Sequence, residues 1–171
     1  MIQENQKGFT LVELLVTVGI IGILATIIVA SLSGTRGRAR DAQRISDVKQ
    51  FSALLDAEAS SEPGSDDKGI TLTTCGAGAD INTCTNTGTI KTEDFQKFKD
   101  PGVKATSPVC VKNGVAVCRY GIADTAGTAA GKTGDYQICF YLETSGGVDG
   151  EAGKVNSLTR GGKIVKNCAG A

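Results

Sequence analysis

The chain has 171 residues, a net charge of zero, and neither histidine nor tryptophan. Without histidine, the commonest metal ligand and the usual general base near neutral pH are missing. The balanced charge also gives no bulk attraction for nucleic acid or anionic lipid. The composition therefore argues against much of ordinary enzyme chemistry. We expect a protein that is not an enzyme, with no catalytic residues, no metal and no cofactor.

The N-terminal region is dominated by an apolar run over residues 9–32, which carries a single charge, Glu13. A helix rises about 1.5 Å per residue, so this run would span roughly 36 Å. That exceeds the ~30 Å hydrocarbon core of a bilayer, and we predict a transmembrane helix here. A carboxylate inside such a helix is costly and is usually paired and functional. The alternative is that Glu13 lies near the interface and reaches water.

Residues 33–62 are predicted to continue as an amphipathic helix that ends at Pro63-Gly64. Apolar side chains recur every three or four residues and form one face, made of Ile45, Val48, Phe51, Leu55 and Ala59. The wet side is predicted to hold Asp41, Asp47, Lys49, Asp56 and Glu58. Four arginines near the start of this helix either bind lipid headgroups or a neighbour's aspartates, or form a solvated collar: Arg36, Arg38, Arg40 and Arg44.

Residues 63–171 differ in character, because glycine is frequent and short β-branched runs replace the helical pattern. We predict a globular β-rich head of three or four antiparallel strands packed on the helix, which is an α+β fold. The clearest hairpin turns at Asn113-Gly114. The expected strands cover 109–112, 115–122, 136–144 and, as a strand or turn, 161–166. A strand or ordered loop is expected at 70–74, and a short helix capped by Thr92 at 92–99.

All six cysteines follow residue 74, namely Cys75, Cys84, Cys110, Cys118, Cys139 and Cys168. An even number without close Cys-x-x-Cys pairs indicates disulfides formed outside the cytoplasm rather than a metal site. Six cysteines allow 15 pairings, and we expect nearest neighbours to pair: 75 with 84, 110 with 118, and 139 with 168. A strict two-residue turn at Asn113-Gly114 would instead turn Cys118 away from Cys110, toward another strand.

Two weaker motifs are set aside. Residues 126–133 nearly match a phosphate-binding loop, but Ala126 replaces the first glycine and no helix is expected to follow. Asp149 and Glu151 are two carboxylates in a glycine-rich turn, without the longer acidic series of a calcium loop. We expect a flexible loop at the first position and a solvated turn at the second.

The segment Lys7-Gly8-Phe9-Thr10-Leu11-Val12-Glu13 resembles the processing signature of type IV pilins and the related pseudopilins. The resemblance implies that residues 1–8 are a leader, that a prepilin peptidase cuts between Gly8 and Phe9, and that Phe9 is then N-methylated. It also implies an assembly role for Glu13, whose charge would neutralise the Phe9 amine of a neighbouring subunit. Two departures are Glu4 in the leader, where such leaders are usually more basic, and Ala30, where many pilins carry proline.

This resemblance implies a structural subunit, a pilin, of a bacterial type IV pilus-like surface filament used for adhesion, motility or DNA uptake. The partners would be copies of itself or related pilins, the prepilin peptidase, the pilus assembly platform and the inner membrane. Nucleic acid is a possible partner, but the charge of the head gives no indication of it. Residues 64–171 hold 12 Lys and Arg and 11 Asp and Glu, so their net charge is only +1.

The expected location is the cytoplasmic membrane, as a single-pass protein, before assembly and the extracellular pilus afterwards. The first alternative is a pseudopilin of a type II secretion or competence system. The second is a membrane-tethered or secreted binding domain that does not assemble. N-terminal sequencing of the mature protein separates the second alternative from the assembling proteins.

Overall fold

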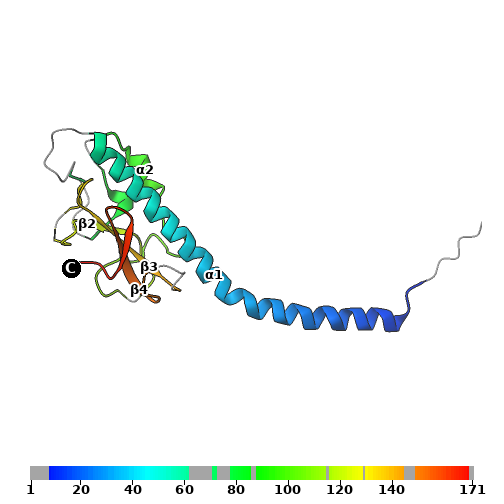
Figure 1. Ribbon diagram of the computed structural model, residues 1–171. Coiled ribbons are helices and arrows are strands. Elements are labelled where there is room, and N and C mark those ends of the chain that lie inside the picture. The colour runs from blue at the N-terminus through cyan, green and yellow to red at the C-terminus, as the bar shows by residue number, and fades with distance from the viewer. Residues whose placement is uncertain are drawn as a thin grey trace, which may run out of the picture. The chain divides into compact units, whose positions relative to one another are not determined.

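The computed structural model describes residues 8–61, 71–72, 78–85, 88–114, 116–128, 130–144 and 149–169, and only the backbone of residues 30–33. Its contacts divide the chain into two compact units, with the division between Arg36 and Gly37. Helix α1 (Leu11–Ser61) contributes to both units (Figure 1). Each unit is described below by itself.

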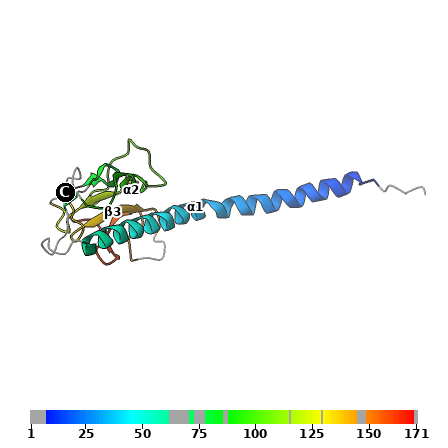
Figure 2. The same ribbon diagram turned by 90° about the horizontal axis from the view of Figure 1, so that it is seen from above.

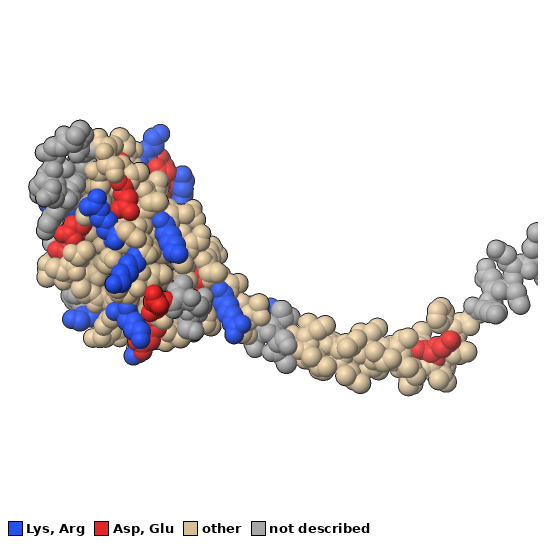
Figure 3. Space-filling model, viewed as in Figure 1, with Lys and Arg blue, Asp and Glu red and all other residues tan. Residues whose placement is uncertain are grey.

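The described part of the first unit is the early part of α1. Residues Leu11–Val29 have a mean hydropathy of 2.6, and this stretch is long and apolar enough to cross a membrane. None of it is buried against other parts of the protein. Glu13 is its single charged residue, and the corresponding helix surface is otherwise uncharged in the space-filling view (Figure 3). Such a surface requires either lipid or other apolar helices around it.

In the second unit, the later part of α1 packs through the apolar face predicted from the sequence. Val48, Phe51 and Leu55 are almost fully buried, and Ile45 packs against the same core from a half-buried position. Two short helices, η1 (Ile81–Thr83) and α2 (Thr92–Gln96), complete this layer. The ring of Phe51 lies 5.5 Å from that of Phe95 in α2, measured between ring centroids.

A five-stranded antiparallel sheet lies against α1 (Figures 1 and 2). The strands follow the order of the chain: β1 (Ala79–Asp80), β2 (Gly121–Ala123), β3 (Gln137–Leu142), β4 (Lys154–Thr159) and β5 (Lys163–Lys166). Alternation along β3 separates the two faces. Ile138, Phe140 and Leu142 join the core beneath α1, whereas Cys139 joins a second cluster on the opposite face. The fold is α+β, as the sequence predicted.

The second cluster holds two disulfides, one joining Cys110 to Cys118 and one joining Cys139 to Cys168. These are two of the three pairs expected from nearest-neighbour pairing. All four half-cystines are buried together with Val155. Cys75 lies outside the described residues, and its pairing with Cys84 stays a prediction.

Several local predictions were wrong. The segment around Asn113-Gly114 is not a two-stranded hairpin, because Val109 and Arg119 form a single parallel bridge and the nearest strand, β2, starts at Gly121. Asn113 has a positive φ of 59°. The turn at this residue lies between Cys110 and Cys118, which form a disulfide, and it does not join two paired strands. Helix α2 is capped by Lys91 rather than Thr92, since the Asp94 carboxylate accepts from the Lys91 N–H at 3.3 Å.

The sequence reasoning also missed β4, which pairs with both β3 and β5. Its residues do not alternate simply, because Asn156 and Ser157 are buried polar side chains. Asn156 satisfies its amide on the backbone of Glu151 and Lys154. At the expected segment 70–74, Thr71 forms an isolated bridge to Lys132, and residues 70, 73 and 74 lie outside the described part.

Candidate functional site

The start of α1 is fixed by two side chains that cap each other. The Glu13 carboxylate accepts from the Thr10 N–H at 3.0 Å and from the Thr10 hydroxyl at 2.9 Å, through the same oxygen. The Glu13 N–H donates in turn to the Thr10 hydroxyl oxygen at 3.3 Å. This is a capping box, in which Thr-x-x-Glu satisfies backbone N–H groups that the first helical turn leaves free.

The capping box directs the Glu13 carboxylate to the beginning of the helix, where it contacts the backbone N–H and the hydroxyl of Thr10. Phe9 is 87% exposed, and among the described residues no atom lies within 4 Å of a Cβ built on Gly8. Thr10-x-x-Glu13 is itself a sequence signature of a helix start, so this local role of Glu13 could have been found from the sequence.

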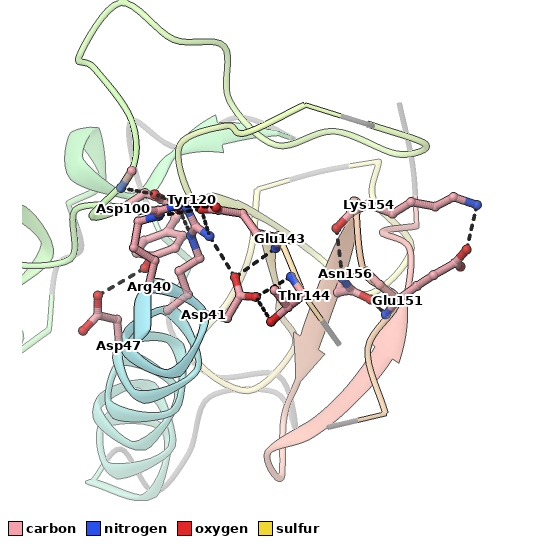
Figure 4. Close-up of polar contacts among 12 residues, drawn as sticks. Arg40, Asp41, Asp47, Asp100, Tyr120, Glu143, Thr144, Glu151, Lys154 and Asn156 are labelled. Carbon is pink, nitrogen blue, oxygen red and sulfur yellow. Dashed lines mark hydrogen bonds and ion pairs between the residues drawn. The ribbon is translucent and has the colours of Figure 1, made fainter. Parts of the chain in front are cut away.

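A cluster of charged side chains centred on Arg44 joins α1 to other segments of the second unit. Figure 4 shows Arg40, Asp41, Asp100 and Glu143 of this cluster. The Arg44 guanidinium is fully buried and binds Asp100 through two bonds, Nε to Oδ2 at 2.7 Å and Nη2 to Oδ1 at 3.0 Å. Its Nη1 reaches Asp41 at 2.9 Å and Glu143 at 2.8 Å. Burial by itself lowers the pKa of Arg44, but these carboxylates outweigh it and the net pKa is raised.

The loop that follows β3 is fastened to α1 by the same cluster. Asp41 accepts from the backbone N–H groups of Glu143 and Thr144 at 2.9 and 2.6 Å, and from the Thr144 hydroxyl at 2.8 Å. Arg40 binds Glu143 through two bonds of 2.8 and 2.5 Å. Hydrogen bonds from Arg40, and then from Arg44, lower the pKa of Glu143 to about 2. Arg40 and Glu143 therefore both stay charged at neutral pH.

Further along α1, two buried tyrosines donate to acids of the helix. The Tyr120 hydroxyl donates to Asp47 at 3.1 Å, and the Tyr136 hydroxyl donates to Asp56 at 2.9 Å. Burial raises the pKa of both phenols, and burial also raises the pKa of Asp47. These contacts add polar specificity to an otherwise apolar helix–sheet interface.

These contacts correct two predictions from the sequence, the solvent-exposed side of the helix and the solvated or partner-binding group of arginines. Asp41 and Glu58 are buried rather than solvated, the latter accepting from the backbone N–H and the hydroxyl of Thr89. Arg40 and Arg44 bind carboxylates of the same unit instead of lipid or a neighbour, and Arg36 and Arg38 remain exposed. A helical pattern shows which side a residue faces but not which distant partner reaches it.

The motifs set aside from the sequence show no ligand-binding geometry in the described residues. The described part of 126–133 forms turns and a bridge between Lys132 and Asp135, with no helix after it. Glu151 pairs with Lys154 at 2.8 Å. Within the described part of the chain, no three acidic or cysteine side chains gather where they could hold a metal ion.

Comparison with known proteins bears on the N-terminal segment. The prokaryotic N-terminal methylation motif matches residues 4–29. The N-terminal part of the chain is similar to type IV pilins and pseudopilins. The chain is 38% identical over 56 residues to the type II secretion system core protein G of Klebsiella michiganensis, a match that covers 33% of this chain and 39% of that protein.

Two further proteins are similar to part of the chain. The type II secretion system core protein G of Escherichia coli is 38% identical over 53 residues, covering 31% of this chain and 37% of that protein. The type IV wide pilus major component of Thermus thermophilus is 50% identical over 38 residues, covering 22% of this chain and 29% of that protein. The matches thus span less than two fifths of these relatives, and no solved structure matches the chain significantly.

Proposed function

We propose that the chain is a pilin, the structural subunit of a type IV pilus-like surface filament, assembled through its N-terminal helix. The observation that carries this proposal is the methylation motif over residues 4–29, followed by an uncovered apolar stretch from Leu11 to Val29. The same pairing of motif and helix fits a single-pass membrane anchor before assembly. We infer a structural rather than an enzymatic role.

In this proposal a prepilin peptidase cuts between Gly8 and Phe9 and the new Phe9 amine is methylated. The amine has an ordinary pKa of about 7.7–8.0 and carries a positive charge at neutral pH. Glu13 of one subunit neutralises the Phe9 amine of its neighbour when the apolar helices bundle. A subunit out of register would leave both charges unpaired in an apolar setting, which costs several kcal/mol.

The length of the mature protein tests the processing step. Mass spectrometry of the chain purified from membranes should give a species that starts at Phe9 with one added methyl group. A Gly8→Asp variant serves as the control and should keep the leader. A mature start near Gly34 would overturn the proposal, because the apolar helix would then be a removed signal.

A second candidate function is a pseudopilin of a type II secretion or competence system. It is favoured by the relatives named core protein G of type II secretion systems, which are 38% identical to this chain over 56 and 53 residues. Electron microscopy of cells that express the chain separates the two functions. Long surface fibres that bind an antibody raised against this chain would support the pilin function. Their absence, together with loss of protein secretion on deletion, would support the pseudopilin.

A further inference from the structure

Asn113 is the only asparagine of the chain that is followed directly by glycine. This dipeptide is chemically labile, because glycine has no side chain to hinder attack of its backbone nitrogen on the side-chain carbonyl carbon of the asparagine. Asn113 is exposed, and its Nδ2 has no hydrogen-bond partner among the described residues. The group that this reaction releases, ammonia, therefore has free access to water.

The fold itself requires the labile dipeptide. Asn113 has a φ of 59°, in the left-handed region that asparagine adopts more readily than most other residues. A Cβ added at Gly114 would lie 2.7 Å from Cγ2 of Val155, so a side chain at that position would collide with strand β4. The Gly114 carbonyl also accepts from the Val155 N–H at 2.9 Å. Packing of this turn on β4 thus places glycine after asparagine.

The side chain of Asn113 is bound to Asn167. The Asn167 Nδ2 donates to the Asn113 Oδ1 at 2.7 Å, and the Asn113 N–H donates to the Asn167 Oδ1 at 2.7 Å. The Cys168 N–H donates to the same Asn167 oxygen at 2.9 Å. Because two backbone N–H groups require an oxygen there, the Asn167 amide has one orientation, with its NH₂ group toward Asn113. The carbonyl that would be attacked is therefore fastened to a distant segment of the chain.

Asn167 is held in turn by two strands. Its carbonyl accepts from the Ser157 hydroxyl of β4 at 2.8 Å. The next residue, Cys168, is joined by a disulfide to Cys139 of β3. Because Asn167 is fixed in this way, its two hydrogen bonds restrict the side-chain torsion angles of Asn113.

The attacking nitrogen is engaged as well. The Gly114 N–H donates to the Val111 carbonyl at 3.1 Å. To react, this nitrogen has to lose its proton, and the Asn113 side chain has to turn toward it. The first step breaks the bond to Val111 and the second breaks the contact with Asn167. A hydrogen bond contributes about 0.5–1.5 kcal/mol net, so these contacts slow the reaction but do not prevent it.

We propose that Asn113 is a site of spontaneous deamidation and that Asn167 sets its rate in the folded protein. The Gly114 nitrogen forms a bond to the Asn113 Cγ, and the bond from Cγ to Nδ2 breaks. Nδ2 leaves as ammonia with the proton of the Gly114 nitrogen, and a cyclic imide remains. Water then opens the imide at either carbonyl and gives aspartate or isoaspartate. This inference does not rest on the proposed function.

Both products change the exposed turn at residues 111–114, which lies in a loop that a disulfide closes. Each product carries a new carboxylate beside Lys112. Isoaspartate also routes the backbone through the former side chain, which lengthens the loop and displaces the Gly114 carbonyl from the Val155 N–H. Deamidation therefore gives this surface a second covalent form with one more negative charge.

Incubation of the full chain in detergent and heavy-oxygen water tests the site, because opening of the imide inserts an oxygen atom from the solvent. Trypsin cleaves after Lys112 and Arg119, and mass spectrometry of the peptide 113–119 then measures the labelled product. Asn113→Gln should abolish this product. The unmodified chain should be labelled at least about tenfold faster when it is unfolded in guanidinium chloride, with its disulfides intact, than when it is folded, a ratio that corresponds to about 1.4 kcal/mol.

Asn167→Gly tests the protecting contact. Glycine accepts the φ of 68° at this position, so the substitution removes the side chain without straining the backbone. We expect labelling at Asn113 in the folded variant to be about tenfold faster than in the unmodified chain, which corresponds to about 1.4 kcal/mol. Lys166→Ala, at the exposed neighbouring position, is the matched control and should leave the rate unchanged. Intact disulfides and slow labelling at the buried Asn156 confirm that each variant folds.

An unchanged rate in folded Asn167→Gly would overturn the protecting role, and a slower rate would show instead that Asn167 activates the carbonyl. Equal labelling of the folded and unfolded unmodified chain would overturn the proposal whatever the variants do, and this comparison decides if Asn167→Gly does not fold. Labelled product that persists in Asn113→Gln would overturn the assignment of the site. Each of these outcomes leaves the proposed assembly function standing.

Discussion

Arg44 and Asp100 form a buried, two-bond ion pair although 56 residues separate them in the chain. Neither side chain is accessible to solvent. The pair ties α1 to the segment that follows α2, and Glu143 ties the same guanidinium to the loop after β3. One arginine of the long helix therefore fixes two distant segments of the head, which gives the first prediction.

Arg44→Met should destabilise the head by about 3–5 kcal/mol, because Asp100 and Asp41 would remain buried without their cation. Urea unfolding of the full chain in detergent measures this, followed by tyrosine fluorescence because the chain lacks tryptophan. Arg38→Met is the control, since Arg38 is exposed, and should change the free energy of unfolding by less than about 0.5 kcal/mol. A loss below 1 kcal/mol for Arg44→Met would contradict the buried-pair account.

Stability should fall in acid partly through Glu143. Its pKa is lowered from 4.5 to about 2 in the folded chain, so the unfolded chain binds a proton at higher pH than the folded one. The resulting stability is fully present above pH 4.5 and is lost as the pH falls toward 2. The loss is at most about 3–4 kcal/mol, since each pKa unit corresponds to about 1.36 kcal/mol. Unfolding curves for Glu143→Gln should show a flatter pH dependence in this window, and an unchanged slope would count against the assignment.

The two described disulfides should differ in their contribution. The pair Cys139–Cys168 closes a separation of 29 residues and the pair Cys110–Cys118 one of 8. Loop-closure entropy then gives about 3.6 and about 2.5 kcal/mol respectively. Replacing each pair by alanine should destabilise the head in that order, measured by urea unfolding. The two double variants serve as controls for each other, and the reverse order would show that chain entropy does not decide the difference.

The capping role of Glu13, which the structure shows, and its proposed charge-pairing role in assembly can be separated by substitution. Glutamine at this position can still cap the helix through Thr10, but it carries no charge. Glu13→Gln should therefore leave membrane insertion and the helix start intact and abolish filaments. Thr10→Ala should keep the charge and cost about 1 kcal/mol of helix stability, with filaments retained. Counting filaments by electron microscopy decides between the roles. Normal filaments from Glu13→Gln would refute the charge-pairing account.

The sequence alone determined that a long helix begins with an apolar stretch and continues with an amphipathic part that packs on the sheet. An unbroken apolar run with one charge admits few structures other than a helix in an apolar setting. The spacing of Val48, Phe51 and Leu55 likewise identified the face that meets the sheet. The processing signature around Gly8 was also readable, because it is local.

Tertiary structure alone decided which charges are buried and how the sheet is completed. Asp41 looks solvated on a helical wheel, yet it is buried because Arg44 and the loop after β3 satisfy it. Strand β4 lacks a period-2 pattern, because its polar residue Asn156 is buried. The side-chain amide of Asn156 forms hydrogen bonds with the backbone N–H and carbonyl of Glu151, which offset the cost of burying it. A buried polar group needs a hydrogen-bond partner. For Asp41, one such partner is the backbone N–H of Glu143, 102 residues further along the chain, and no local sequence pattern predicts that contact.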